Sequence, residues 1–545
     1  MSQKLKPKLF SVMKTYTKDQ FIKDVVAGLI VAIIALPLSI ALAISSGTTP
    51  EVGLYTAIIA GFFIAVLGGS RVQIGGPSAT FMVVVYGVIA QHGMEGMIIT
   101  TILAGLILIG FGLLKLGSTI KYIPYPITIG FTSGIAVTIF SSQIKDFFGL
   151  NIGEVPTAFV DKWGLFISSM DTMHVQTTLV ASLALGLLII WPRVNRKIPA
   201  SLISILVTTI LVNALNLDVL TIGGRYPDLS SALPTLRFPQ FSIREIGIFI
   251  QPAFTIAFLC SVESLLSAVV SDGMIGSKHR SNMELIAEGV ANIASGLFGG
   301  IPATGAIART VANIKNGGRT PIAGIVHSLT LLLILVFFMP LVKLIPLPTL
   351  AAILVMVSYN MSEWRTFKGL LKAPKSDIAV LLTTFILTVV VDLAVAISVG
   401  MVLAAFLFMK RMTDVLAISD MSEEQESAEN EVIRTISKQV LVYEVNGPFF
   451  FGAADKFLDS IQSLQGPSKV LIIKMTHVPF IDATALHALD LLYEHAKSNK
   501  TQLLLADVNS QLYEIMTRSN FTQLIGEDHI CETLEQAYER ANQYI

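Results

Sequence analysis

The sequence predicts an α-helical polytopic membrane domain followed by a smaller cytosolic α/β domain, and composition is the first observation behind this prediction. Of the 545 residues, 53% are hydrophobic and 14% are charged. A soluble globular domain carries about 25% charged residues. Residues 413–545 have a net charge of −11, and residues 1–412 have a net charge of +11. This opposition of charge indicates two domains.

Changes of composition along the chain place the domain boundaries. Residues 1–23, with six lysines and one aspartate, suit a cytosolic N-terminal segment. No small-residue cleavage site precedes the first apolar run, so we interpret that run as a retained membrane helix. We expect a transmembrane domain over residues 24–412, an acidic linker over 413–432 and an α/β domain over 433–545.

Fourteen apolar runs predict the transmembrane segments, seven before and seven after a polar interval at residues 216–243. They lie near 24–44, 52–69, 74–91, 97–115, 124–143, 174–191, 198–215, 246–271, 284–298, 302–314, 321–341, 346–360, 377–392 and 394–409. Several are shorter than the roughly 20 residues of a full span. We therefore expect a seven-plus-seven inverted repeat with two half-helices.

Charges in the loops set the predicted orientation. With a cytosolic N-terminus, every loop predicted to be cytosolic carries Lys or Arg, as the positive-inside rule requires. These residues include Arg71, Lys115, Arg193, Lys278, Lys315, Arg365 and Lys410. One helix more or fewer would invert this pattern downstream. We expect a multi-pass protein of the plasma (inner) membrane with both termini in the cytosol.

Two interruptions containing glycine and proline mark the expected binding site. Residues 299–309 read GGIPATGAIAR, and residues 75–80 read GGPSAT. Paired interruptions in two oppositely oriented halves are typical of a transporter site between inverted repeats. We expect helices at 77–91 and 302–315, because proline suits the first turn of a helix. A pair of plain glycine-rich turns is the alternative.

Two opposed helix N-termini favour an anion, because each presents free N–H groups and about half a positive charge. Ser78, Thr80 and Thr304 would add hydroxyl donors, and Arg309 would add a full charge. An arginine exposed to lipid at membrane depth costs about 2.5–3.5 kcal/mol or more. Arg309 should therefore face a cavity or a carboxylate, and snorkelling toward the cytosol is the alternative.

Glu263, in the middle of the run at 246–271, is the candidate coupling group, with Ser267 one turn later on the same helix face. An intramembrane carboxylate is a functional-site hypothesis by default. Glu263 could exchange a proton, or it could hold Na⁺ together with the Ser267 hydroxyl. An ion pair with Arg309 that only joins the two halves is the structural alternative.

The remaining motifs argue against an enzyme and against nucleic acid as a partner. The sequence contains no phosphate-binding loop, nucleophile elbow or metalloprotease motif, and its two cysteines cannot build a disulfide framework or a thiolate metal site. His92, His279 and His327 lack metal-ligand spacing, so we interpret them as structural. The acidic C-terminal domain has no basic patch. We expect no cofactor, only H⁺ or alternatively Na⁺ as coupling ion.

Residues beyond 432 alternate between strand and helix patterns, which predicts a compact α/β domain. The strand-like runs lie at 439–445, 469–475 and 502–508, and the helical patterns lie near 453–465, 483–498, 509–518 and 531–542.

The sequence resembles the sulfate permease (SulP) family of anion transporters over residues 20–545. The resemblance is carried by PLSIALAISSGTTPEVGLYTA at 37–57, by GGPSAT at 75–80 and by residues 261–313, which begin SVESLLSAVVSDG. FIDATALHAL at 480–489 resembles a C-terminal STAS domain.

The resemblance implies a core domain that moves against a gate domain in an elevator-like way, usually within a homodimer. It places the anion between the third and tenth helices, at Pro77, Ser78, Ala79, Thr80, Ala303, Thr304 and Arg309. Family members with Asp and Thr at the positions of Glu263 and Ser267 resemble sodium-coupled bicarbonate transporters, whereas those with Glu look more like proton-coupled carriers. The resemblance therefore favours protons here.

The main hypothesis is a secondary active, proton-coupled symporter of sulfate or of a similarly small anion such as bicarbonate or a dicarboxylate. The alternatives are a sodium-coupled bicarbonate transporter, a nucleobase carrier on the same fold, and a membrane sensor whose STAS domain recruits a cytosolic protein. STAS domains switched by phosphorylation have Ser or Thr two residues after an aspartate, as Thr484 follows Asp482. Phosphorylation of Thr484 is thus a regulatory hypothesis, with a plain helix cap as the alternative.

Overall fold

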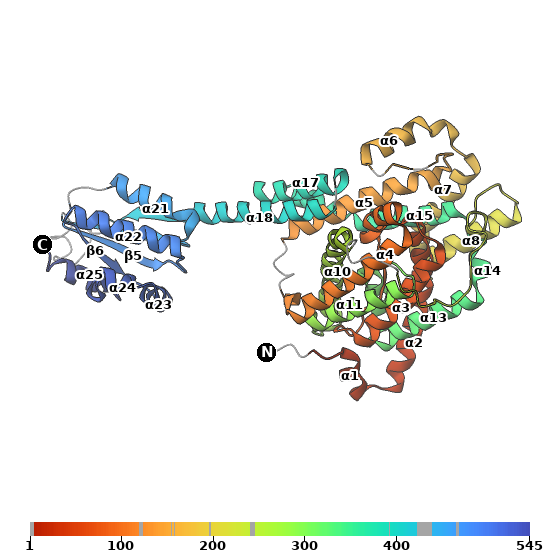
Figure 1. Ribbon diagram of the computed structural model, residues 1–545, viewed down its shortest axis with the longest axis horizontal. Coiled ribbons are helices and arrows are strands. Elements are labelled where there is room, and N and C mark those ends of the chain that lie inside the picture. The colour runs from red at the N-terminus through yellow and green to blue at the C-terminus, as the bar shows by residue number, and fades with distance from the viewer. Residues whose placement is uncertain are drawn as a thin grey trace. The chain divides into compact units, whose positions relative to one another are not determined.

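The computed structural model describes residues 5–118, 124–153, 155–156, 158–195, 198–239, 246–391, 393–421, 439–464 and 468–545. The chain forms two compact units, Met1–Met401 and Val402–Ile545 (Figure 1). Residues 1–4 of the predicted N-terminal segment and residues 422–432 of the predicted linker lie outside the described residues.

The first unit is mainly helical, and each of the fourteen apolar runs overlaps a helix or one leg of a helix. The main helices are α2 (Lys18–Ser45), α3 (Pro50–Leu67), α4 (Met82–Leu113), α5 (Tyr125–Phe148), α7 (Val175–Val194), α8 (Ala200–Ala214), α10 (Ile246–Ile275), α11 (Ser281–Leu297), α12 (Ile307–Lys315), α13 (Ile322–Phe337), α15 (Leu347–Met361), α17 (Lys375–Val390) and α18 (Leu393–Val415), of which residues 393–401 belong to this unit. The runs at 74–91 and 97–115 both fall on α4, whose two legs meet at the non-helical Gly93. Seven helices among the described residues are long and apolar enough to cross a membrane. The number of spans remains a prediction.

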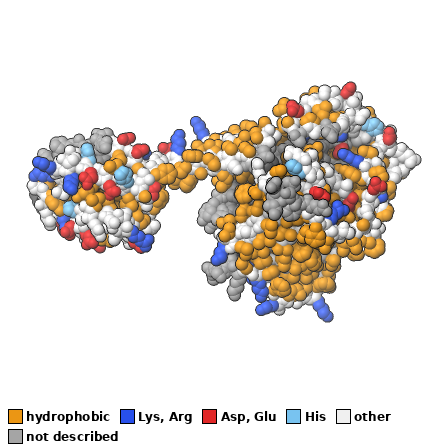
Figure 2. All heavy atoms as spheres, viewed as in Figure 1, with side chains coloured by type: hydrophobic (Ala, Val, Ile, Leu, Met, Phe, Trp, Pro, Cys, Tyr) orange, Lys and Arg blue, Asp and Glu red, His pale blue; other side chains and the backbone are white. Residues whose placement is uncertain are grey.

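Shorter helices connect these segments. They are α1 (Lys8–Val12), α6 (Phe159–Ser168), α9 (Ile222–Arg225), α14 (Met339–Val342) and α16 (Trp364–Leu370). Large hydrophobic side chains such as Leu179, Ile210 and Phe254 are more than half exposed. Figure 2 shows a broad hydrophobic area on the visible face of this unit. Such a surface suits contact with lipid rather than with water.

The helices of the first unit pack in two bundles. In the first bundle, α2, α3 and α4 pack with α10, α11, α12 and α13, so that it combines helices from both halves of the sequence. In the second bundle, α5, α7, α8, α15 and α17 pack together. The crossing of α4 and α11 is close, because a Cβ at Gly105 would meet the Gly289 carbonyl oxygen and a Cβ at Gly289 would meet the Gly105 carbonyl oxygen. Small residues permit such contacts between membrane helices.

The two sequence interruptions pair with each other inside the first bundle. Strands β1 (Gly75–Pro77) and β2 (Ala303–Gly305) are antiparallel, with Gly76 opposite Thr304. The prediction that helices begin at Pro77 and Pro302 is therefore wrong. A 3₁₀ turn, η2 (Ala79–Phe81), leads into α4, and α12 begins only at Ile307. Backbone groups at membrane depth need hydrogen-bond partners, and the extended pairing supplies them before each helix starts.

The second unit contains a five-stranded sheet of order β3-β4-β5-β6-β7. Its strands are β3 (Ala417–Asp420), β4 (Val440–Asn446), β5 (Val470–His477), β6 (Gln502–Ala506) and β7 (Ile530–Cys531), and its helices are α21 (Phe451–Leu464), α22 (Ala483–Ser498), α23 (Ser510–Arg518), α24 (Phe521–Ile525) and α25 (Leu534–Ala541). The pairs from β4 to β7 are parallel, whereas β3 is antiparallel to β4. The sheet thus begins inside the segment predicted as a linker, because a four-residue strand with mostly exposed side chains gives little apolar signal.

Candidate anion site

A cavity of about 370 Å³ lies between the two bundles, next to the paired strands. Residues 77–80, Glu263 and residues 306–309 line it from the first bundle. Apolar side chains of α5 and α15, such as Phe131 and Val357, line it from the second bundle. A few polar groups in a mostly apolar cavity are typical of a small-molecule site.

The structure brings together six of the nine residues predicted for this site. Pro77, Ser78, Ala79, Thr80, Glu263 and Arg309 line the cavity. The other three lie behind it. Thr304 is fully buried and donates to the Cys260 carbonyl at 3.2 Å, and Ser267 donates to Thr310 Oγ1 at 3.3 Å. Ala303 bonds through both its backbone N–H and its carbonyl to the side chain of Asn292.

Arg309 reaches from α12 to the first interruption. Its Nη2 donates to the Pro77 carbonyl at 3.1 Å and to Ser39 Oγ at 3.4 Å, and the side chain is 1% exposed. Position 76 accommodates this approach only as glycine, because a Cβ there would collide with Arg309 Nη1. This geometry does not match an arginine that snorkels toward the cytosol.

Two donors of the same guanidinium have no partner. Arg309 Nε and Nη1 are buried, and neither makes a hydrogen bond. Leaving a buried polar group unpaired costs about 1–3 kcal/mol, and more for a charged group. Both groups have essentially no accessible surface, so an anion in the cavity would pair with them only after the Arg309 guanidinium turns toward it.

Glu263 lies beside the start of the other half-helix. Ser78 Oγ is 2.9 Å from Glu263 Oε1 and 2.8 Å from Oε2, and the same serine oxygen accepts from Thr80 N to cap η2. Among the described residues, no ion pair within 4 Å joins Glu263 to Arg309. The two side chains line one cavity but have separate hydrogen-bond partners. The structure therefore does not show the Glu263–Arg309 ion pair that was the structural alternative.

Helix N-termini add partial positive charge to a cavity that Arg309 and the carboxylates of Glu263 and Glu363 also line. The starts of η2 and α12 both border the cavity, through residues 79–80 and 307–309. The first N–H groups of a helix have no intrahelical acceptor, and they carry the positive end of the helix dipole. Guanidinium, hydroxyl and helix N-termini together form a site with the chemistry of anion recognition.

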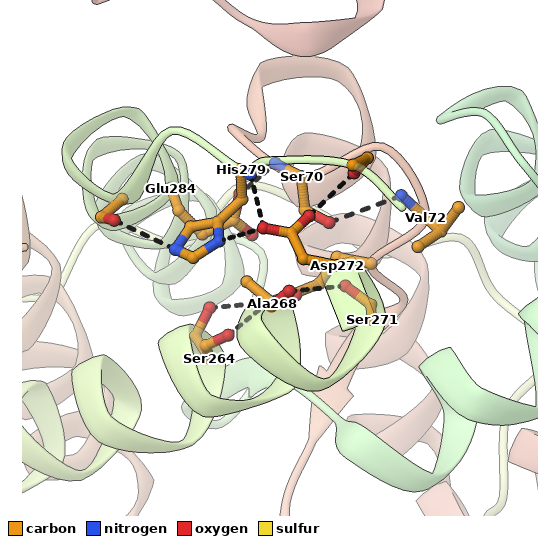
Figure 3. A network of polar contacts seen from close by, with 11 residues as sticks. Ser70, Val72, Ser264, Ala268, Ser271, Asp272, His279 and Glu284 are labelled. Carbon is orange, nitrogen blue, oxygen red and sulfur yellow. Dashed lines mark hydrogen bonds and ion pairs between the residues drawn. The ribbon is translucent and has the colours of Figure 1, made fainter. Parts of the chain in front are cut away.

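Sequence reasoning missed a row of buried polar residues on α11. Glu284, Glu288 and Asn292 are fully buried, and Glu284 accepts from Ser70 N at 2.7 Å (Figure 3). The available signal was two glutamates four residues apart in an otherwise apolar segment, which places both on one helix face. Nearby, the Asp272 carboxylate accepts from His279 N and contacts His279 Nδ1, both at 2.7 Å (Figure 3).

The predicted structural histidines occupy different settings. His279 pairs with Asp272, His92 packs its ring against Phe249 at 5.2 Å between centroids, and His327 is fully buried in α13. Within the described ranges, no group of three or more His, Cys, Asp or Glu residues could hold a metal ion.

In the second unit, Asp482 is the N-cap of α22. Its carboxylate accepts from Ala485 N at 2.9 Å and from Phe451 N at 2.9 Å. Thr484 lies in the first turn of α22 with an exposed side chain. Asp482 therefore acts as a helix cap, as the alternative interpretation expected, and phosphorylation of Thr484 stays a prediction.

The chain is similar over nearly its whole length to known transporters. The family model described as the sulfate permease family matches residues 21–384, and the STAS domain model matches residues 431–537. YvdB of Bacillus subtilis (strain 168), a protein named for sulfate transport, is 38% identical over 95% of this chain and 97% of its own. The bicarbonate transporter BicA of Picosynechococcus sp. is 29% identical over 95% of this chain and 94% of its own.

A solved structure has the same fold. The murine Solute Carrier 26 family member A9 anion transporter in the inward-facing state superposes with a TM-score of 0.87 at 19% identity, covering 99% of this chain and 94% of that chain. The predicted fold class is confirmed at this level: a helical multi-span membrane protein with a mixed α/β STAS domain.

Proposed function

The chain belongs to the sulfate permease family of membrane anion transporters, which are not enzymes, and on this premise we propose that it moves a small anion by proton-coupled symport. Sulfate is the first candidate substrate, because the family and YvdB are named for it. Bicarbonate is the second, because BicA is named for it, and a dicarboxylate is the third.

The observation that carries the proposal is the pair of unpartnered donors on Arg309, a residue that lines the cavity together with Ser78 and Glu263. An oxyanion that accepts from Nε and Nη1 would satisfy both buried groups and neutralise the guanidinium. A neutral nucleobase would form weaker hydrogen bonds with these charged donors than an oxyanion would.

The Ser78–Glu263 contact supports coupling to protons. The Ser78 hydroxyl has one proton, and an ionised Glu263 takes it as a hydrogen bond. A protonated Glu263 can itself donate to Ser78 Oγ, and the serine proton is then free to bond to the anion. Proton binding would thus strengthen anion binding in the same cavity, as symport requires. The sodium alternative is less well supported, because Ser267 does not line the cavity.

The position of the cavity supports an elevator-like movement. Both interruptions, Glu263 and Arg309 belong to the first bundle, while α5 and α15 close the cavity from the second bundle. Displacement of one bundle against the other would expose the cavity to one side of the membrane at a time. The homodimer, the plasma (inner) membrane and the cytosolic placement of the N-terminus and STAS domain complete the proposal.

Uptake into proteoliposomes tests the proposed function. The full chain should accumulate labelled sulfate or bicarbonate inside the vesicles when the outside is more acidic than the inside. It should not respond to a sodium gradient alone. Flux that ignores the pH gradient would remove the proton part of the proposal. If neither anion is taken up, and neither competes with a labelled dicarboxylate, anion transport itself is refuted.

A truncation tests the sensor alternative. A chain that ends after Arg411 keeps the apolar run at 394–409 and removes the STAS domain. A transporter should keep measurable anion binding in this form, whereas a sensor that acts through its STAS domain should lose its function.

A further inference from the structure

Side chains of α11 occupy the place that a third strand would take beside β2. Asn292 Oδ1 accepts from Ala303 N at 2.9 Å, and Asn292 Nδ2 donates to Ala303 O at 2.9 Å. One turn further along the helix, Ser295 Oγ donates to Ile301 O at 2.7 Å. The extended segment is therefore held by β1 on one side and by helix side chains on the other.

Glu288 continues this row at the end of β2. Its Oε1 accepts from Gly305 N at 2.9 Å and from Ser264 Oγ at 2.7 Å, and its Oε2 contacts Cys260 Sγ at 3.6 Å. Gln73 Nε2 donates to Ser264 Oγ at 2.7 Å, so the serine proton is directed at Glu288. The Glu288 side chain is fully buried and does not line the cavity.

We propose that Glu288 is a positioning residue for the anion site. By holding the Gly305 N–H, its carboxylate fixes the end of β2 and with it the start of α12. Only Ala306 separates Gly305 from α12, and Arg309 lies in the first turn of that helix. Ala306 N donates separately to the Ile74 carbonyl at 3.0 Å, so Glu288 shares the start of α12 with this bond. Releasing Gly305 would loosen the backbone that carries Arg309. The inference rests on the proposed function only where it says that Arg309 binds an anion.

Two substitutions separate positioning from charge. Glu288→Ala leaves the Gly305 N–H without an acceptor. Glu288→Gln keeps an oxygen at the Oε1 position, which carries the Gly305 and Ser264 bonds, and it removes only the charge and the weak thiol contact. Glu284→Ala is the matched control, since Glu284 is equally buried one turn earlier on α11 but holds Ser70 instead of β2.

Hydrogen–deuterium exchange of the purified full chain in detergent tests the positioning without any transport. We expect backbone amides of residues 301–309 to exchange at least tenfold faster in Glu288→Ala than in the wild type, because a hydrogen bond to a charged group is lost. Glu288→Gln should stay within threefold of the wild type, and Glu284→Ala should leave these amides unchanged. Unaltered exchange in Glu288→Ala, or equal acceleration in Glu284→Ala, overturns the proposal.

Uptake of labelled sulfate and bicarbonate in proteoliposomes supplies the functional readout. Glu288→Ala should raise the KM for the transported anion about tenfold while the maximal rate per folded molecule changes less, and Glu288→Gln should restore the KM. A merely structural role would lower the amount of folded protein without changing the KM. A Glu288→Gln variant as impaired as Glu288→Ala would overturn positioning in favour of a requirement for the charge.

The exchange experiment and the uptake experiment test different claims, so one can fail without the other. If the wild type transports neither anion, the proposed function is wrong, while the exchange measurement still decides whether Glu288 holds β2. If Glu288→Ala yields no folded protein, Glu288→Asp replaces it, since a carboxylate withdrawn by one methylene should give intermediate exchange and an intermediate KM. Wild-type values for Glu288→Asp in both experiments would overturn the proposal.

Discussion

Consecutive residues of α10 face two regions of opposite character. Glu263 faces the cavity, where it has Ser78 as a partner and where Arg309 keeps two unpartnered donors. Ser264 faces away from the cavity, where it links Gln73 to the Glu288 carboxylate that also holds Gly305. On the cavity side two donors of a charged side chain lack a partner, whereas the described residues on the opposite side form a connected network in which only the neutral Gln73 Oε1 lacks one. The comparison indicates that binding chemistry and positioning are divided between the two sides of one helix.

The largest expected effect is that of Glu263→Gln on the cavity side. Proton-driven accumulation should be abolished, because an amide cannot exchange a proton, while the protein should fold normally. Uptake into vesicles whose outside is more acidic than their inside measures this loss. Glu284→Gln, a buried carboxylate outside the cavity, should retain the response, and equal accumulation by Glu263→Gln would assign Glu263 to structure.

Arg309→Ala should weaken anion binding by about 100-fold, because the charged donors of the cavity are removed. Arg309→Lys should bind more tightly than the alanine variant but less tightly than the wild type, since an ammonium keeps the charge without the planar donor set. Competition binding of sulfate against a labelled anion measures both. Unchanged affinity in Arg309→Ala would mean that the cavity is not the anion site.

Gly76→Ala tests the close approach between the interruptions. Its Cβ would collide with Arg309 Nη1, and relieving an overpacked contact costs about 1–3 kcal/mol. We expect roughly tenfold weaker anion binding. Gly87→Ala is the control, because a Cβ at Gly87 meets nothing within 4 Å. An equal effect of both substitutions would show that the Gly76–Arg309 contact does not matter.

The smallest expected effect lies on the side away from the cavity. Ser264→Ala removes the hydrogen bond to Glu288 and the one from Gln73, which keeps the Ser264 carbonyl as an acceptor. The substitution should lower the stability of the protein by about 1 kcal/mol without altering its response to pH. Thermal unfolding in detergent and pH-dependent uptake measure the two quantities. Ser261→Ala, which loses only a bond to the Ala257 carbonyl of its own helix, is the matched control. A changed pH response in Ser264→Ala would mean that this side also takes part in coupling.

Much of the fold and part of the site could be predicted from the sequence. Glu263 and Arg309 stand out because a charged residue inside an apolar membrane run costs free energy and therefore indicates a functional site. The helix starts at Pro77 and Pro302 were predicted wrongly, because local proline preference says nothing about a strand partner from the other half of the chain. Glu288 was missed because only tertiary packing distinguishes a buried glutamate on α11 from one on a solvated face.

The dependence of anion affinity on pH tests most directly whether Glu263 couples protons to the anion through Ser78. Sulfate affinity, or bicarbonate affinity if uptake identifies that substrate, should rise for the wild type as the pH falls. Glu263→Gln should bind the anion with an affinity that does not change with pH, because its amide donates permanently to Ser78 Oγ. The same pH dependence in both proteins would contradict the account.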